Sequence, residues 1–288
     1  KSGKLTIGVD KVADQRVDAL VAMFHPKRVV QAEVRYVDIP WAPEGMGKSQ
    51  GIGGEYLNVL QSTDALLQVV RVFEDPSVPY VQGSVEPSRD AATMDLELAF
   101  SDLGIIERRF LRLEAELKGA KAQERERNTV ETALLTRLKD GIEHDIAIRE
   151  EELTNEEVKL ISAYQFLTAK PMLVLFNIGE AQLLQASVIE KEESERLGKS
   201  SVQVATICAK LEADLAQLAS AEEEEFRLSL EAGEPGAAKV TRLSYQLLGL
   251  ISFFTTGPDE VKAWTVRQGT PAVKAAGQIH SDIERGFI

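Results

Sequence analysis

The chain has 288 residues, 44% of them hydrophobic and 27% charged, which suits a globular protein with room for two domains. Its net charge of −13 argues against a broad nucleic-acid-binding surface, and three histidines with one cysteine make a zinc site unexpected. The sequence contains no run of about 18 apolar residues, the length that would predict a membrane span. Residues 1–10 lack the apolar core of a secretory signal, and the lone Cys208 cannot form an internal disulfide. These features favour a cytoplasmic protein.

Short apolar runs predict β-strands along the first third and the middle of the chain. They are residues 4–9, 29–38, 65–73, 171–178 and 201–207. The runs at 65–73 and 171–178 are continuously apolar, as in strands buried in a parallel sheet. Residues 54–64 have the spacing of a short helix. Strands alternating with helical segments predict a doubly wound α/β domain.

A long helical pattern interrupts these strands. Residues 94–117 carry apolar side chains at spacings of three and four: Leu96, Phe100, Leu103, Ile106, Phe110, Leu113 and Leu117. The pattern resumes over residues 129–146 with Val130, Leu134, Leu135, Leu138 and Ile142. Between them, residues 118–128 are charged and are expected to form a solvated tip. The pattern predicts an antiparallel helical hairpin whose two apolar stripes face each other.

The C-terminal third changes character twice. Residues 212–230 predict an acidic helix, residues 231–236 a loop, and residues 237–250 another helix. After these come predicted strands or loops around a small helix near residues 271–276: 251–257, 260–266 and 277–288. This segment predicts the start of a second, smaller domain, with Phe253, Phe254 and Trp264 in its core rather than in a ligand-binding surface.

The glycine-rich residues 45–54 contain Gly-Lys-Ser, the ending of a Walker A loop. A Walker A loop also needs a glycine five residues before the Gly-Lys pair, and that position is Ala42. A better interpretation starts from Asp38, which ends a predicted strand and precedes this glycine-bearing segment and a helix. Walker B and switch II regions are built in this order, and their Asp binds Mg²⁺ through water. The alternative is that Asp38 simply ends a strand at a turn.

Several segments, in order along nearly the whole chain, resemble the YchF-type Obg-like ATPases. They are residues 37–75, 170–180, 253–270 and 274–288. The resemblance implies a P-loop NTPase G domain of α/β class with a parallel sheet, an inserted α-helical hairpin and a partial C-terminal β-grasp domain of the TGS type. The implied boundaries are 1–88 and 166–246 for the two parts of the G domain, 89–165 for the coiled-coil insertion, and 247–288 for the TGS-like domain.

The resemblance also implies a set of nucleotide-binding residues. The family's specificity element N-x-x-E matches Asn177 and Glu180, so these residues and Ile178 would border the base. Cys208, Ala209 and Lys210 would form the last base-contacting loop. GTPases have N-K-x-D, whose Asp binds guanine, and the family's Glu shifts the preference toward adenine. Without the resemblance, Asn177 could equally be a polar residue that caps a buried strand.

The chain departs from the family pattern at three places: the N-terminal segment, switch II and the TGS-like segment.

The family begins with a strand and a Walker A loop, whereas residues 2–5 align better with switch I and place Ser2 near the family's Mg²⁺-binding threonine. In switch II, which would include Asp38 and Gly45, Trp41 replaces the glycine whose N–H meets the γ-phosphate. Ala42 takes the hydrophobic position that the family has in place of a water-orienting glutamine. The TGS-like segment is incomplete. The sequence identifies no catalytic side chain, and hydrolysis is expected to be slow.

The resemblance therefore predicts an ATP-preferring P-loop NTPase that acts as a conformational switch with Mg²⁺, with GTP as a possible second nucleotide. The hairpin and the TGS-like segment would contact the ribosome or its RNA, and the protein would be a cytoplasmic monomer. The alternative is a non-hydrolysing paralogue whose degenerate site leaves only a protein or ribosome interaction module. Glu180 disfavours an ordinary GTPase.

Overall fold

The computed structural model describes residues 5–39, 52, 54–78, 83–119, 121–198 and 201–287. The chain forms two compact units, one of Trp41–Ile207 and the other of Lys1–Pro40 with Cys208–Ile288. Among the helices in the described ranges, none combines the length and the apolar character needed to cross a membrane.

A parallel sheet is the centre of the unit 41–207. Its strands β4 (Leu66–Arg71), β5 (Met172–Asn177) and β6 (Val202–Ile207) lie in the order β4-β5-β6, with β5 in the middle. The first five residues of β5 are buried, as its continuously apolar sequence predicts. Helices α2 (Gly54–Ser62) and α6 (Ala186–Leu197) accompany these strands, and their alternation confirms the α/β prediction for this unit.

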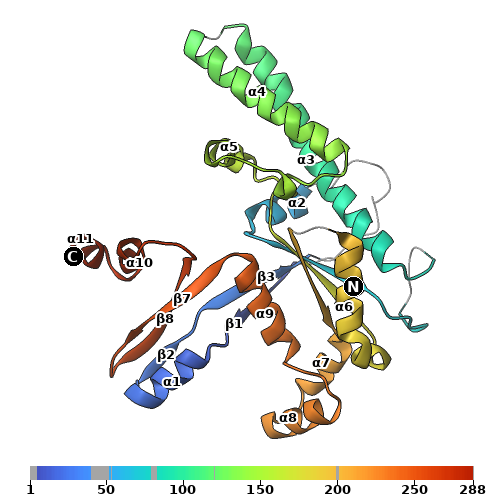
Figure 1. Cartoon of the computed structure of the whole chain (residues 1–288), viewed down its shortest axis with the longest axis vertical. Helices are drawn as coiled ribbons and strands as arrows, with labels where there is room; N and C mark the ends of the chain where they lie inside the picture. The colour runs from blue at the N-terminus through green and yellow to red at the C-terminus, as the bar shows by residue number, and fades with distance from the viewer. Residues whose placement is uncertain are drawn as a thin grey trace. The chain divides into compact units, whose positions relative to one another are not determined.

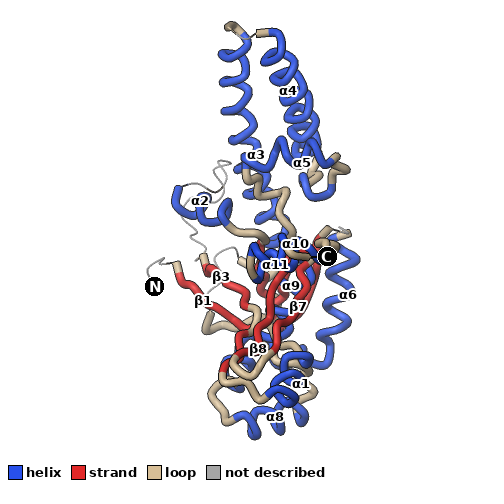
Figure 2. The backbone as a smooth tube through the Cα atoms, turned by 90° about the vertical axis from the view of Figure 1, so that its left-hand side faces the viewer, coloured by secondary structure: helices blue, strands red, loops and turns tan. Residues whose placement is uncertain are grey.

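Two long helices form the predicted hairpin. Helix α3 (Pro87–Leu117) and helix α4 (Ala122–Glu143) run side by side in both Figure 1 and Figure 2. The expectation that residues 118–128 form a non-helical tip is wrong for most of that segment, because α4 begins at Ala122. The Lys121 N–H donates to Glu124 Oε2 at 3.0 Å, which caps the start of α4. The charged residues that follow have high helix propensity and continue the helix.

The hairpin core contains only part of the predicted apolar stripes. Its buried members include six predicted residues: Ile106, Leu113, Leu134, Leu135, Leu138 and Ile142. Leu103 and Phe110 pack against them. Four predicted members are instead exposed: Leu96, Phe100, Leu117 and Val130. Leu96 and Phe100 come before the hairpin core along α3. In this part of the helix another face, which carries Ala91 and Leu98, packs on the sheet. At Val130 the neighbouring Glu131 is buried instead, because it binds Arg109.

Short helical segments complete the unit 41–207. They are η1 (Ile148–Glu150), α5 (Asn155–Ile161), η2 (Ser162–Tyr164) and η3 (Glu180–Gln185), of which the η segments are 3-10 helices. The first three lie between α4 and β5 along the chain, and η3 follows β5 directly.

The other unit contains two small sheets. β1 (Thr6–Lys11) pairs antiparallel with β3 (Glu33–Asp38). β2 (Arg28–Val30) pairs parallel with β8 (Glu260–Arg267), which pairs antiparallel with β7 (Leu250–Thr256). The prediction of one strand over residues 29–38 is therefore wrong. The Val12 N–H donates to the carbonyl of Ala32 at 2.8 Å between β2 and β3, where the chain passes from one sheet to the other.

The helices of this unit are α1 (Gln15–Phe24), α7 (Ala209–Leu215), α8 (Ser220–Ser229), α9 (Gly236–Leu247), α10 (Ala272–Ile279) and α11 (Ser281–Arg285).

Two secondary-structure predictions fail in this part of the chain. The acidic helix predicted over 212–230 is broken between α7 and α8. The end of the chain, predicted as strand or loop over 277–288, contains α11, whose first turn is capped by the Asp282 N–H donating to His280 Nδ1 at 3.2 Å. The small core includes Tyr245 and Ala263, with Phe254 packed against it, while Phe253 and Trp264 stack on each other with ring centroids 6.4 Å apart.

Candidate functional site

The carboxyl ends of the three parallel strands lie level with one another. Arg71 of β4 is in register with Asn177 of β5, which is in register with Ile207 of β6. In open parallel sheets, ligands bind outside the carboxyl ends of the strands. This edge therefore brings the predicted base-binding residues of β5 to the position where a nucleotide site is expected.

The backbone at the end of β5 is held on both sides. The Asn177 carbonyl accepts the Val72 N–H at 2.9 Å, and the Ile178 N–H donates to the Ile207 carbonyl at 2.8 Å. Ile178 is only 2% exposed, whereas the Asn177 side chain is half-buried. The strand thus fixes the position of Asn177, whose amide can both donate and accept hydrogen bonds.

A tight turn follows and leads to Glu180. The Gly179 N–H donates to Gln182 Oε1 at 2.9 Å, and the Gln182 N–H donates to the Gly179 carbonyl at 2.9 Å. A Cβ on Gly179 would stand 3.2 Å from Cβ of Phe73, so the turn packs closely against the segment after β4. Glu180 is exposed and begins η3. Its carboxylate, which accepts hydrogen bonds, therefore lies within three residues of the Asn177 amide on a constrained turn.

Arg71 is a residue of this edge that sequence reasoning did not assign. Its Nε donates to the Phe73 carbonyl at 2.8 Å and its Nη1 donates to the Val78 carbonyl at 3.0 Å. Its guanidinium also lies 4.6 Å from the centroid of the Phe73 ring. Arg71 thus ties the segment after β4 to the end of the strand. The available signal was an arginine at the last position of an apolar strand, where an unpaired charge is costly.

The other three predicted base-contacting residues follow β6 in the chain and belong to the second compact unit. Cys208 precedes α7 as its N-terminal cap and is 5% exposed, and its carbonyl accepts the Glu212 N–H at 3.0 Å. Ala209 and Lys210 begin α7 and are exposed.

The predicted switch and metal residues are only partly described. Asp38 is the last residue of β3, is exposed and is in register with Thr6 of β1. Ser2, Trp41 and Gly45 lie outside the described residues. Within the described ranges, no group of three or more His, Cys, Asp or Glu side chains is placed so that it could hold a metal ion. One carboxylate at a strand end still fits Mg²⁺, which is commonly held by one or two carboxylates, water and the phosphates of its substrate.

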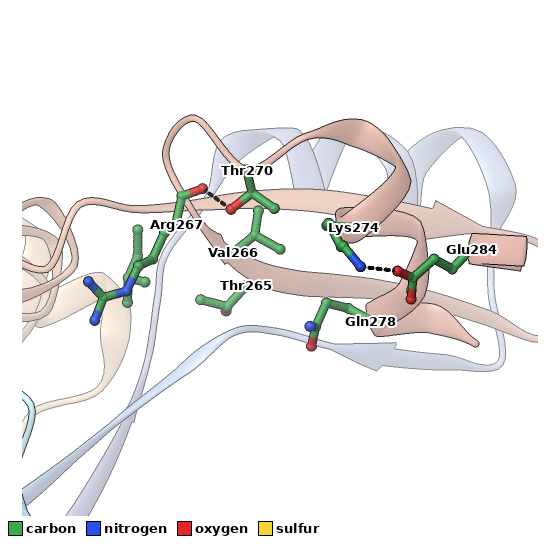
Figure 3. A pocket seen from close by; sticks show the side chains of 9 residues that line it. Thr265, Val266, Arg267, Thr270, Lys274, Gln278 and Glu284 are labelled. Atoms are coloured by element: carbon green, nitrogen blue, oxygen red, sulfur yellow. Dashed lines mark hydrogen bonds and ion pairs between the residues drawn. The ribbon is translucent and has the colours of Figure 1, made fainter. Parts of the chain in front are cut away.

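A cavity of about 430 Å³ lies beside β8 and α10. The residues that line it are far along the sequence from the ends of β4, β5 and β6. Figure 3 shows the Thr270 hydroxyl donating to the Arg267 carbonyl at 2.6 Å, and the Lys274 ammonium paired with Glu284 at 2.6 Å. Glu284 raises the pKa of Lys274 and neutralises its charge. This lining offers polar contacts without a group poised for proton transfer, so we do not assign the candidate site to it.

Comparisons with known proteins relate the whole chain to one family. The family model YchF-GTPase_C, described as a protein of unknown function, matches residues 250–288. The ribosome-binding ATPase YchF of Bacillus subtilis is 34% identical over 285 residues, which are 98% of this chain and 76% of that protein. The protein of the same name from Haemophilus influenzae is 35% identical over 281 residues, again 98% and 76% of the two chains.

The solved structure of the Schizosaccharomyces pombe YchF GTPase superposes with a TM-score of 0.82 at 31% identity. The match covers 98% of this chain and 76% of that one, and confirms the predicted α/β fold class. The similarity thus extends from the parallel sheet through the hairpin to the C-terminal segment. The chain belongs to the YchF family.

Proposed function

We propose that the protein is an ATP-preferring P-loop NTPase that works as a nucleotide-dependent switch on the ribosome. Two relatives that are 34% and 35% identical to it are named ribosome-binding ATPases. The observation that carries the proposal is the turn from Asn177 to Glu180 at the carboxyl edge of the parallel sheet. A carboxylate there can accept a hydrogen bond from the exocyclic amine of adenine, and the Asn177 amide can donate or accept beside it.

The roles of the remaining residues are part of the same proposal. Cys208, Ala209 and Lys210 complete the base site, and Asp38 and Ser2 hold Mg²⁺ with the phosphates. When bound, Mg²⁺ neutralises charge on the phosphates. Trp41 and Gly45 belong to switch II, and the bulk of Trp41 keeps hydrolysis slow. Residues 1–88 and 166–246 form the nucleotide-binding domain, 89–165 the hairpin arm and 247–288 a TGS-like segment. The protein acts in the cytoplasm as a monomer.

Calorimetric titration of the full-length protein with ATP and GTP in Mg²⁺ tests the nucleotide choice. We expect ATP to bind more tightly, and Glu180→Gln to reduce that preference because it removes the acceptor charge. Glu190→Gln is not a suitable control, because Glu190 Oε2 accepts the Thr206 N–H of β6 at 3.1 Å. Glu192→Gln changes an exposed glutamate of α6 and should leave both affinities unaltered. A clear preference of the unaltered protein for GTP would remove the proposal.

The second candidate is a non-hydrolysing interaction module, which Trp41 in switch II favours. Both candidates predict that the protein sediments with ribosomes, so turnover distinguishes them. Phosphate release above the rate of ATP alone, lost when Mg²⁺ is chelated, supports the NTPase. Ribosome binding without such release supports the module.

A further inference from the structure

Helix α3 packs into two cores without a break. Near its start, Ala91 and Leu98 are buried with the parallel sheet, beside residues such as Val70 of β4 and Phe176 of β5. Farther along, its buried residues belong to the hairpin core. A single helix of 31 residues therefore connects the hairpin to the sheet, and a displacement of one end is carried to the other.

Ser101 lies where α3 passes from one core to the other, and it contacts the segment that leads into α2. The Ile52 N–H donates to Ser101 Oγ at 2.7 Å, and the Ser101 hydroxyl donates to the Glu97 carbonyl of its own helix at 2.8 Å. Ser101 is 5% exposed. Ile52 also packs against the sheet core. A shift of α3 therefore changes the position available to Ile52.

The next residue, Asp102, binds the segment that leads into β5. Its Oδ1 accepts the Leu167 N–H at 2.8 Å, and its Oδ2 accepts the Thr168 N–H and the Thr168 hydroxyl, both at 2.7 Å. Asp102 and Leu167 have no exposed surface, and Thr168 is 3% exposed. Three hydrogen bonds to a buried carboxylate are strong and directional. They join α3 to the chain four residues before β5, whose other end carries Asn177.

The same segment is also held by α2 and by η1. The Lys170 ammonium donates to the Gln61 carbonyl at 3.0 Å, at the C-terminal end of α2. The Arg149 Nη1 donates to the Thr168 carbonyl at 3.2 Å. Residues 167–170 are therefore a junction where α2, α3 and η1 meet the start of the central strand.

We infer that α3 acts as a lever. Through Ser101 and Asp102 it couples the position of the hairpin to the proposed nucleotide site at the carboxyl edge of the parallel sheet. A partner that displaces the hairpin changes the setting of Ile52 and of the junction 167–170, and so changes ATP affinity or turnover. Because such coupling is reciprocal, ATP binding in turn changes the position or the local stability of the hairpin. Ser101 and Asp102 are positioning residues in this scheme, because they touch neither the nucleotide nor the partner. The inference rests on the proposed function, since it names how that site is regulated.

Hydrogen–deuterium exchange of the full-length protein, with and without saturating ATP and Mg²⁺, tests the lever. We expect ATP to change the exchange of α4 about fivefold or more, the lower end of typical coupling between sites. Ser101→Ala and Asp102→Asn should bring that change close to zero while ATP still binds. Ser88→Ala is the matched control, because Ser88 is on the same helix but its hydroxyl accepts from Arg196 Nη1, at 3.0 Å. It should keep the full response.

Ribosomes supply the reverse measurement. Saturating ribosomes should shift the Kd for ATP in the unaltered protein and in Ser88→Ala, and by less in Ser101→Ala. If Asp102→Asn does not fold, as judged by circular dichroism, Ser101→Ala alone decides the outcome.

The outcomes separate the lever from the proposed function. If ATP binds but α4 does not respond, or if both junction variants respond fully, the lever is wrong and the ATP site stands. An equal loss in Ser88→Ala also contradicts the lever, because the effect would then not depend on the junction. If ATP does not bind the unaltered protein, the proposed function fails and the inference fails with it.

Discussion

Asp102 is a charged group in an environment that disfavours charge. Burial raises the pKa of its carboxyl group from 3.8 to about 6, while the hydrogen bonds from Thr168 and Leu167 and the nearby charge of Arg149 oppose this rise. Burial lowers the pKa of Arg149 as well. At neutral pH the carboxylate is still ionised, so it accepts all three hydrogen bonds of the junction.

The raised pKa of Asp102 predicts a pH dependence of stability. Between about pH 4 and pH 6 the folded state keeps a proton that the unfolded state has released, so this group's contribution to the free energy of unfolding falls as pH rises. The shift of about two units corresponds to about 3 kcal/mol, which is fully lost above pH 6. Urea denaturation of the unaltered protein and of Asp102→Asn across pH 4.5–7.5 isolates the effect. We expect the stability difference, unaltered minus variant, to decrease with pH.

The opposite trend, or a constant difference, would show that Asp102 does not titrate in this way. Glu157 is an unsuitable comparison group, because its hydrogen bonds with Thr154 and the nearby charge of Arg137 lower the pKa of its carboxyl group.

Sequence patterns could single out Asn177 and Glu180 as candidate site residues, but they could not single out Asp102. Asn177 ends a continuously apolar strand and Glu180 follows that strand, and the two match a family motif at fixed spacing. Asp102 lies beside Leu103 in an amphipathic helix, where an acidic residue normally faces solvent. Its burial depends on Leu167 and Thr168, more than sixty positions later in the chain. No local pattern carries that pairing.

At the scale of the helices, Leu113 is the central member of the hairpin core and is 2% exposed. Leu113→Ala should lower the free energy of unfolding by about 2–5 kcal/mol, because it leaves a cavity between α3 and α4. Leu111→Ala is the matched control on the same helix, since Leu111 is 69% exposed, and should cost less than about 0.5 kcal/mol. Thermal or urea denaturation measures both.

The damage from Leu113→Ala should remain in the hairpin, because the junction at Ser101 and Asp102 is unchanged. We expect ATP affinity to survive and ribosome binding to fall. Loss of ATP binding with intact ribosome binding would mean that the hairpin belongs to the nucleotide core, and the proposed division at residues 89–165 would be wrong.

Helical periodicity predicted the existence of α3 and α4 but not which turns form the hairpin core. A spacing of three and four marks one face of a helix, and it cannot show that the helix changes partners along its length. Leu96 and Phe100 fit the stripe and are 47% and 36% exposed, because there the buried face of α3 is the one that carries Ala91 and Leu98. The strands β4, β5 and β6 were predicted well, most clearly β5, whose continuously apolar sequence is typical of a parallel strand buried on both faces.

At the scale of the whole chain, long-range pairing decides what local patterns cannot. β2 pairs with β8, more than two hundred positions away, so residues 1–40 and 208–288 form one compact unit. Within the other unit, α3 contributes to both the sheet and the hairpin, which explains why residues 41–207 form a single compact body. The domain boundaries at 88, 165 and 246 rest on the family relationship and remain a proposal.

Among the described strands, β4 forms one end of the sheet β4-β5-β6. Its sequence is that of an interior strand, and Val69 at its middle is 60% exposed. The end strand of a sheet can pair with a strand of another molecule, so we expect β4 to take part in self-association. We expect light scattering to grow with concentration, and Val69→Lys to suppress it, because a lysine on an edge strand opposes intermolecular pairing.

Val158→Lys is the control. Val158 lies on helix α5 and is 49% exposed in the unaltered protein, so this substitution should leave the scattering unchanged. Equal suppression by both lysines would assign the effect to net charge rather than to the sheet edge.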